Sequence, residues 1–214
     1  MKTKDEVIPF LKKVRDEMEL LGRLRIKVGI QGDADSDILT IARVHEYGAT
    51  ITAKSAKNLC IPINKQSYDK SPRDFPGLFF ITSEAGYVFG VVEKQRKRKK
   101  KGGDDLVFLF LLLPSVTIPE RSFIRAGYDA NKDRLTEIVQ AEVAEIYQGR
   151  QTARGAAEWI GGKAVELIQQ YMEEASHFAP KGSIQRDRAP SYADKPLIVT
   201  GRLRNSITFK VEES

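Results

Sequence analysis

Apolar residues near the start of the chain recur every three or four positions, which places them on one face of a helix. This row runs from Val7 through Val14 to Leu21, and Gly22 then supplies a residue at which helices commonly end. From residue 24 to residue 30 apolar and polar side chains alternate, which is the period of a half-buried strand. The sequence therefore predicts a helix followed directly by a strand.

The next part of the chain favours one short helix and then strands. Asp35 or Ser36 can cap a helix that reaches about Tyr47, and Gly48 suits the left-handed turn after it. The strands expected afterwards cover residues 49–53, 59–63, 78–82, 87–93 and 106–113. The last two pair most simply with each other, so the residues between them are expected to form the tip of a long hairpin.

The final third returns to helical spacing. Thr117 and Glu120 have the spacing of a capping box, with Pro119 in the first turn, and predict a helix that extends to about residue 128. Two further helices are expected near residues 135–149 and 157–175. Residues 177–195 contain prolines, a glycine and many charges without periodicity, which indicates a flexible loop. A last strand is expected at 206–211.

Taken together, these elements predict an α+β fold, with a mainly antiparallel sheet packed against N-terminal and C-terminal helices and a protruding basic β-hairpin. The 214 residues suit a single domain over 1–214. Within it, residues 66–105 form an expected elaboration whose tip is 94–101, and 177–195 form the flexible loop.

The net charge of +6 comes largely from one place, because seven of the eight residues from 94 to 101 are basic. Such a run is either a solvated or protein-contacting tip, or a finger that binds phosphates through counterion release without reading sequence. No aromatic residue interrupts it, so stacking on single-stranded bases is not expected. The candidates for partner or DNA contact are Lys94, Arg96, Lys97, Arg98, Lys99, Lys100 and Lys101.

We find no pattern that predicts a metal site, a cofactor site or a catalytic site. Two histidines and one cysteine leave no zinc-ligand spacing. Asp33, Asp35 and Asp37 imitate the start of a calcium loop, but Ile38 and Val44 occupy the positions of its glycine and glutamate. We therefore expect a protein that is not an enzyme. A catalytic triad scattered along the chain would escape this reasoning, so an unrecognised hydrolase stays as a third hypothesis.

Two further features limit the function and the location. His45 and Glu46 are neighbours whose side chains point about 100° apart on a helix, so a partly buried histidine near a helix end is favoured over a catalytic pair. The longest apolar run has eight residues, where a membrane helix needs about 20. The N-terminus also has no signal-peptide pattern, so we expect no membrane contact and a protein made in the cytoplasm.

Three short blocks resemble one known family. They are IARVHEYGATI at 41–51, IPERSFIR at 118–125 and PLIVTGRLRNSIT at 196–208. In this order they resemble the phage virion morphogenesis family, also called the tail-completion or head-to-tail joining proteins of tailed bacteriophages. The segment from about 66 to 105 is not matched by the family pattern, so the resemblance implies no role for the basic run.

The resemblance implies a structural virion protein, a neck or tail-completion subunit related in role to tail terminators. Such a subunit assembles in the host cytoplasm into a ring, with six copies as the expectation, and joins the DNA-filled head to the tail. Its partners would be further copies of itself, head connector or adaptor proteins and tail tube proteins, with possible non-specific contact to genomic DNA in the channel. The alternative is a sequence-independent double-strand DNA-binding module that uses residues 94–101.

Four arginines in the second and third blocks lie near the ends of predicted elements. They could pair with acids of a neighbouring subunit, or they could form ordinary salt bridges on the surface of their own chain. These subunit-contact candidates are Arg121, Arg125, Arg202 and Arg204.

Overall fold

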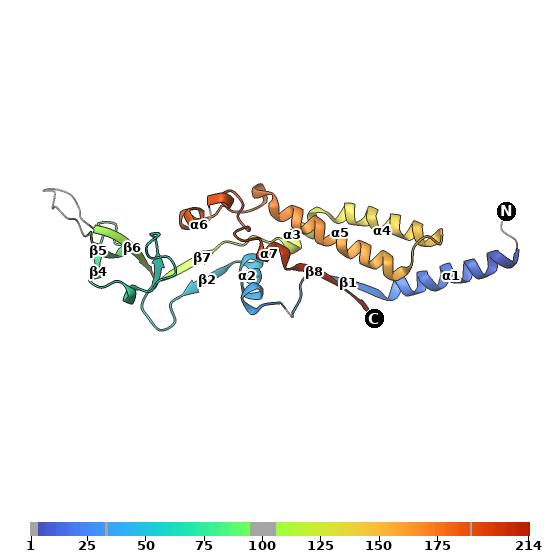
Figure 1. The fold of residues 1–214 in the computed structure, drawn as a ribbon, viewed down its shortest axis with the longest axis horizontal. Coiled ribbons are helices and arrows are strands. Elements are labelled where there is room, and N and C mark those ends of the chain that lie inside the picture. Colours follow the sequence, from blue (N-terminus) through green and yellow to red (C-terminus); the bar gives the residue numbers. More distant parts are fainter. Residues whose placement is uncertain (1–3, 33, 95–105, 189) are drawn as a thin grey trace. The chain divides into compact units, whose positions relative to one another are not determined.

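The computed structural model describes residues 4–32, 34–94, 106–188 and 190–214, and it confirms the predicted α+β fold (Figure 1). The sequence predicted one domain, whereas the chain divides into two compact units. Unit 1 comprises Met1–Gly48, Pro119–Pro180 and Asp194–Ser214, and unit 2 comprises Ala49–Ile118 and Lys181–Ala193. The predicted elaboration at 66–105 falls within unit 2.

Unit 1 contains most of the helices and a two-stranded antiparallel sheet. Its elements are α1 (Lys4–Arg23), β1 (Leu24–Ile30), α2 (Ser36–Tyr47), α3 (Ile124–Ala130), α4 (Lys132–Tyr147), α5 (Ala153–Glu173), a 3-10 turn (Ala175–His177), α7 (Arg202–Asn205) and β8 (Ile207–Glu213). Strands β1 and β8 pair along their whole length, with Val28 opposite Phe209. Helix α5 packs against both strands and against α4, so it forms the centre of unit 1.

One glycine allows the sheet of unit 1 to lie close to α5. A Cβ atom built on Gly161 would lie only 2.3 Å from Cδ2 of Phe209, which is closer than such atoms approach in proteins. The core beside this contact is formed by apolar side chains from all three separated parts of unit 1. It includes Ile38, Ala42, Phe123, Ile168, Met172, Phe178, Leu197, Leu203 and Ile207.

Unit 2 is mainly antiparallel sheet. Its elements are β2 (Ala49–Thr52), β3 (Leu59–Pro62), a 3-10 turn (Pro72–Asp74), β4 (Phe79–Thr82), β5 (Val88–Glu93), β6 (Leu106–Leu113), β7 (Ser115–Ile118), α6 (Ser183–Arg188) and a 3-10 turn (Pro190–Tyr192). Four strands form one sheet in the order β3-β6-β5-β4, and β2 pairs with β7 in a second sheet. The predicted pairing of the two hairpin strands is confirmed, with Phe89 opposite Leu111. The predicted tip is 94–101, and all of it except Lys94 lies outside the described residues.

The helix predicted to begin near residue 118 is wrong at its start. Thr117 lies in strand β7 opposite Thr50, and their hydroxyl oxygens are 3.3 Å apart. Helix α3 begins only at Ile124, and no side chain from the predicted capping box caps it. The capping-box spacing is therefore coincidental, because strand pairing with β2 holds Thr117 in an extended conformation.

The segment 177–195 is also more ordered than the flexible loop that the sequence predicted. It contains α6 and the 3-10 turn at Pro190–Tyr192. The carboxylate of Asp187 in α6 accepts a hydrogen bond from the hydroxyl of Tyr68 at 2.9 Å and lies 3.3 Å from Nζ of Lys65. These contacts fix α6 within unit 2, because they join it to the segment that follows β3.

Candidate functional site

The carboxylate of Glu46, in the last turn of α2, accepts five hydrogen bonds. It is buried, with 5% of the residue exposed. It accepts hydrogen bonds from the backbone N–H groups of Phe123, Ile124 and Arg125 at 2.8, 3.0 and 3.1 Å. It also accepts from the hydroxyl of Ser122 at 2.7 Å and from Nε of Arg125 at 3.0 Å. We call this group of bonds the Glu46 clasp.

The clasp performs the task of an N-cap for helix α3. The first N–H groups of a helix lack partners within the helix and carry a partial positive charge, so they favour a carboxylate. Helix α3 has no side-chain cap of its own, and Glu46 supplies the acceptor from a distant part of the chain. Burial alone would raise the pKa of Glu46, but the hydrogen bonds from Ile124, Ser122, Arg125 and Phe123 outweigh it and lower that pKa.

The clasp joins two of the three blocks on which the family resemblance rests, and the core joins the third. Glu46 belongs to the first block and its donors to the second. Leu203 and Ile207 of the third block are buried in the same core cluster as Ala42 and Phe123 of the first and second. Blocks that are widely separated in the sequence therefore meet in one structure.

His45 is held as a neutral side chain inside unit 1. Burial and the nearby charge of Arg121 lower its pKa to about 4, and its buried Nδ1 has no hydrogen-bond partner among the described residues. The carbonyl of His45 accepts from the backbone N–H of Arg121 at 2.7 Å. His45 therefore belongs to the packing of the clasp region.

We predict that unit 1 loses stability as the pH falls from about 6.5 to about 4. The pKa of His45 in the folded chain lies below its ordinary value of 6.5, so the unfolded chain takes up the proton first. The expected loss between pH 7.5 and pH 5 is about 1–2 kcal/mol, measured by urea unfolding at each pH. His45→Gln should remove most of this slope, and an unchanged slope in that variant would contradict the assignment.

All four predicted subunit-contact arginines have partners within unit 1. Arg121 is buried, and its guanidinium donates to the carbonyls of Ala179 and Pro180 at 2.7 and 2.9 Å. Its guanidinium therefore forms hydrogen bonds inside its own chain. The other three are partly exposed and have partners in their own chain: Arg125 pairs with buried Glu46 and exposed Glu120, Arg202 with Asp35, and Arg204 with Glu173. Their contact with another subunit stays a prediction.

Of the predicted basic contact residues, only Lys94 lies in the described part of the chain. It is exposed and directly follows β5. Arg96, Lys97, Arg98, Lys99, Lys100 and Lys101 lie outside the described residues, so their role in contacts stays a prediction.

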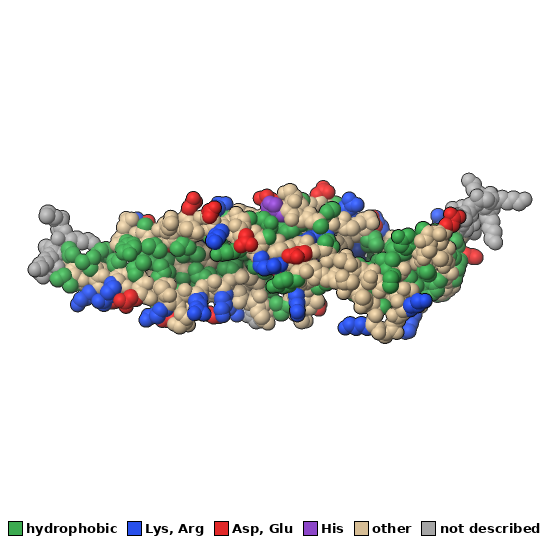
Figure 2. All heavy atoms as spheres, turned by 180° about the vertical axis from the view of Figure 1, so that it is seen from behind, with side chains coloured by type: hydrophobic (Ala, Val, Ile, Leu, Met, Phe, Trp, Pro, Cys, Tyr) green, Lys and Arg blue, Asp and Glu red, His purple; other side chains and the backbone are tan. Residues whose placement is uncertain are grey.

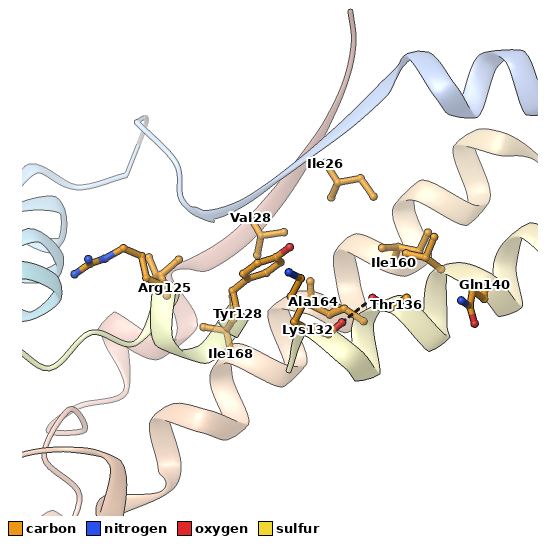
Figure 3. Close-up of a pocket in the computed structure, with 13 residues that line it drawn as sticks. Ile26, Val28, Arg125, Tyr128, Lys132, Thr136, Gln140, Ile160, Ala164 and Ile168 are labelled. Atoms are coloured by element: carbon orange, nitrogen blue, oxygen red, sulfur yellow. Dashed lines mark hydrogen bonds between the residues drawn. The ribbon is translucent and has the colours of Figure 1, made fainter. Parts of the chain in front are cut away.

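An open apolar groove is the second prominent feature of unit 1. It has a volume of about 540 Å³ and lies between β1 and α4, with α5 beneath it (Figure 3). Ile26 and Val28 of β1 face it from one side, Leu135 and Val139 of α4 line the other, and Ile160 belongs to α5. Figure 2 shows hydrophobic side chains gathered in a band along the end of unit 1 that carries these helices, with Lys and Arg side chains along one border.

Few polar groups enter this groove. Arg125, Tyr128 and Lys132 lie toward one end of it, and Thr136 and Gln140 follow along α4. Val139 is 37% exposed and Tyr128 is 51% exposed, although both are large apolar or aromatic residues. The sequence indicated an apolar face on this helix through Leu135 and Val139, but the periodicity did not show that the face is left uncovered.

Comparison with known proteins identified no relative: no family model, no curated protein and no solved structure matches this chain. Within the described residues, no three His, Cys, Asp or Glu side chains are grouped so that they could hold a metal ion. In the same part of the chain, no helix combines the length and apolar character needed to cross a membrane.

Proposed function

We propose that this chain is a structural subunit of a tailed-bacteriophage particle, a tail-completion or neck protein. It forms a ring, of six copies by the resemblance, and joins the DNA-filled head to the tail. The observation that carries this proposal is the convergence of the three family-like blocks on the Glu46 clasp and its adjoining core. Chance similarity of three short segments would give no reason for them to pack together.

The groove supports a role in assembly. Large exposed apolar surfaces on water-soluble proteins commonly mark interaction sites. The groove of unit 1 is lined mainly by aliphatic side chains, and Tyr128 and Val139 remain exposed beside it. A subunit whose surface is completed by neighbours fits this arrangement. Its further partners would be head connector or adaptor proteins on one side and tail tube proteins on the other.

The direct test uses the phage or prophage that encodes the chain. A stop codon early in the gene should leave filled heads and separate tails in electron micrographs, and expression of the gene from a plasmid should restore joined particles. Antibody labelling of intact particles should place the protein at the junction of head and tail. Normal particles without the protein would contradict the proposal.

The basic run favours a second candidate, a sequence-independent double-strand DNA-binding module. We predict that changing Lys97, Arg98, Lys99 and Lys100 to serine leaves the melting temperature nearly unchanged, because the sequence predicts a solvated run and solvated charges contribute little to stability. The same change should impair head-to-tail joining or cause DNA leakage, with normal levels of soluble protein.

The matched control removes the same charge elsewhere, with serine at Lys12, Lys13, Lys54 and Lys57, which are exposed. It should give normal particle yields. Normal yields from the basic-run variant as well would reduce the run to a solvated tip. Duplex DNA binding by the isolated protein that falls steeply with salt, and is lost in the basic-run variant alone, would favour the DNA-binding module.

A further inference from the structure

The layer of strands in unit 1 is narrower than the layer of helices beneath it. Neighbouring strands lie about 4.8 Å apart and packed helices about 8–10 Å apart, so two strands cover roughly one helix. The pair β1 and β8 packs on α5, whereas α4 lies beside α5. The groove over Leu135 and Val139 is therefore the place where the sheet has no further strand.

Strand β1 offers a free edge to this groove. Ser214 donates its backbone N–H to the carbonyl of Arg23 at 3.0 Å, so the odd-numbered residues of β1 bond to β8. In an antiparallel pair the alternate residues face the other way, which leaves the backbone groups of Ile26 and Val28 on the outer edge. Among the described residues β8 is the only strand that pairs with β1. The groove lies on this open side, because β1 lines it and β8 does not.

The chain also carries a short edge strand with no charge or proline of its own. β4 is at the edge of the four-stranded sheet of unit 2 and has the sequence Phe-Phe-Ile-Thr. Natural edge strands are commonly protected by charges, prolines or bulges. β4 has neither charge nor proline, and Phe79 and Phe80 are 39% and 54% exposed. At the opposite edge of the same sheet, β3 contains Pro62.

The open edge of β4 has free backbone groups at alternate residues. Ser83 donates its backbone N–H to the carbonyl of Tyr87 at 2.8 Å, which continues the pairing of β4 with β5. By the same alternation, Phe80 and Thr82 direct their backbone groups away from β5. A strand of four residues spans about 13 Å, so it fits alongside the seven-residue β1.

We propose that β4 of a second copy of this chain pairs with the outer edge of β1 and places the aromatic ring of Phe80 in the groove. This inference rests on the proposed ring. Main-chain hydrogen bonds would join the two strands, and the ring of Phe80 would cover Leu135 and Val139. Because β1 and β4 are different surfaces, the contact is head-to-tail, which is the kind that repeats and closes into rings.

The test breaks each half of the contact separately. Phe80→Lys places a charge on the edge strand, and Val139→Asp places one in the groove. Each variant should weaken self-association at least tenfold in sedimentation experiments, with circular dichroism and melting temperature close to those of the wild type. Val199→Lys is the matched control, because Val199 is 50% exposed and lies outside the groove, and it should assemble normally.

Mixing the two variants provides the decisive measurement. Phe80→Lys retains an intact groove and Val139→Asp retains an intact strand, so the mixture should form one-to-one dimers and nothing larger. A ring that survives both substitutions would overturn the contact and leave the proposed function standing. A wild-type chain that stays monomeric at every concentration would contradict the ring itself, and this contact with it.

A second pair of measurements guards against misfolding of a variant. Phe80→Thr keeps a strand-forming residue and removes the aromatic ring, so it should fold and still weaken assembly. A synthetic peptide of residues 77–86 should bind the Phe80→Lys protein and fail to bind the Val139→Asp protein. Equal binding to both, or to neither, would contradict the assignment of the groove.

Discussion

Replacing Glu46 with alanine is expected to lower the free energy of unfolding by about 3–5 kcal/mol, which is a large part of the stability of an ordinary domain. The substitution leaves the buried backbone N–H group of Phe123 and the partly buried N–H groups of Ile124 and Arg125 without their acceptor. It also removes the carboxylate that takes the place of a side-chain cap at the start of α3. Urea unfolding at pH 7.5 would measure the loss.

Two further variants separate the role of the charge from that of the side chain's shape. Glu46→Gln keeps the shape but presents an amide NH₂ group to the donors, so it should be destabilising, though less than alanine. Glu120→Ala removes the exposed partner of Arg125 and should cost less than about 1 kcal/mol. Equal effects of Glu46→Ala and Glu120→Ala would show that the clasp does not hold unit 1 together.

Ending the chain after Thr200 is expected to leave insoluble or unfolded protein. The deletion removes α7 and β8, and with them the buried side chains of Leu203 and Ile207. Loss of each large core side chain costs about 2–5 kcal/mol. Strand β1 would also lose its only partner among the described strands, and the face of α5 at Gly161 would be uncovered. Expression trials with solubility and thermal melting as readouts would test this.

A shorter deletion is the control for this experiment. Ending the chain after Val211 removes three exposed residues and the bond from Ser214 to Arg23. It also removes the surface ion pairs of Glu212 with Lys27 and of Glu213 with Arg23 and Arg154. That protein should stay soluble and lose about 1 kcal/mol or less. A soluble chain that ends at Thr200 and melts cooperatively would show that β8 is not required for the core.

Local periodicity predicted most elements of this fold but not the contacts that fix them. The alternation at 24–30 corresponds to β1, and the spacing around Leu135 and Val139 corresponds to α4. Both patterns could be recognised because the side chains on one face of a strand or helix recur at a fixed spacing in the sequence. The start of α3 could not be predicted in this way. Its acceptor is Glu46, 78 residues before Ile124, while the nearby capping-box pattern lies partly in a strand.

The candidate site was predicted only in part. The three blocks were found from the sequence, but their meeting around Glu46 depends on tertiary structure. The same limit applies to the groove, since an apolar face on a helix looks alike in sequence whether its own chain or another covers it. The burial of Arg121 could not be predicted either, because nothing in the local sequence distinguishes an arginine that bonds to buried carbonyls from one on the surface.

The position of the clasp along the chain has a mechanical consequence. The chain passes from unit 1 to unit 2 after Gly48 and returns before Pro119, and the strands that begin and end this excursion, β2 and β7, pair with each other. Glu46 lies two residues before the first passage, and its donors lie just beyond the second. A pulling force on unit 2 that is carried by these paired strands therefore acts first on the hydrogen bonds of the Glu46 carboxylate. Because these bonds join α2 to the start of α3, the two helices would share the force before it reached the core.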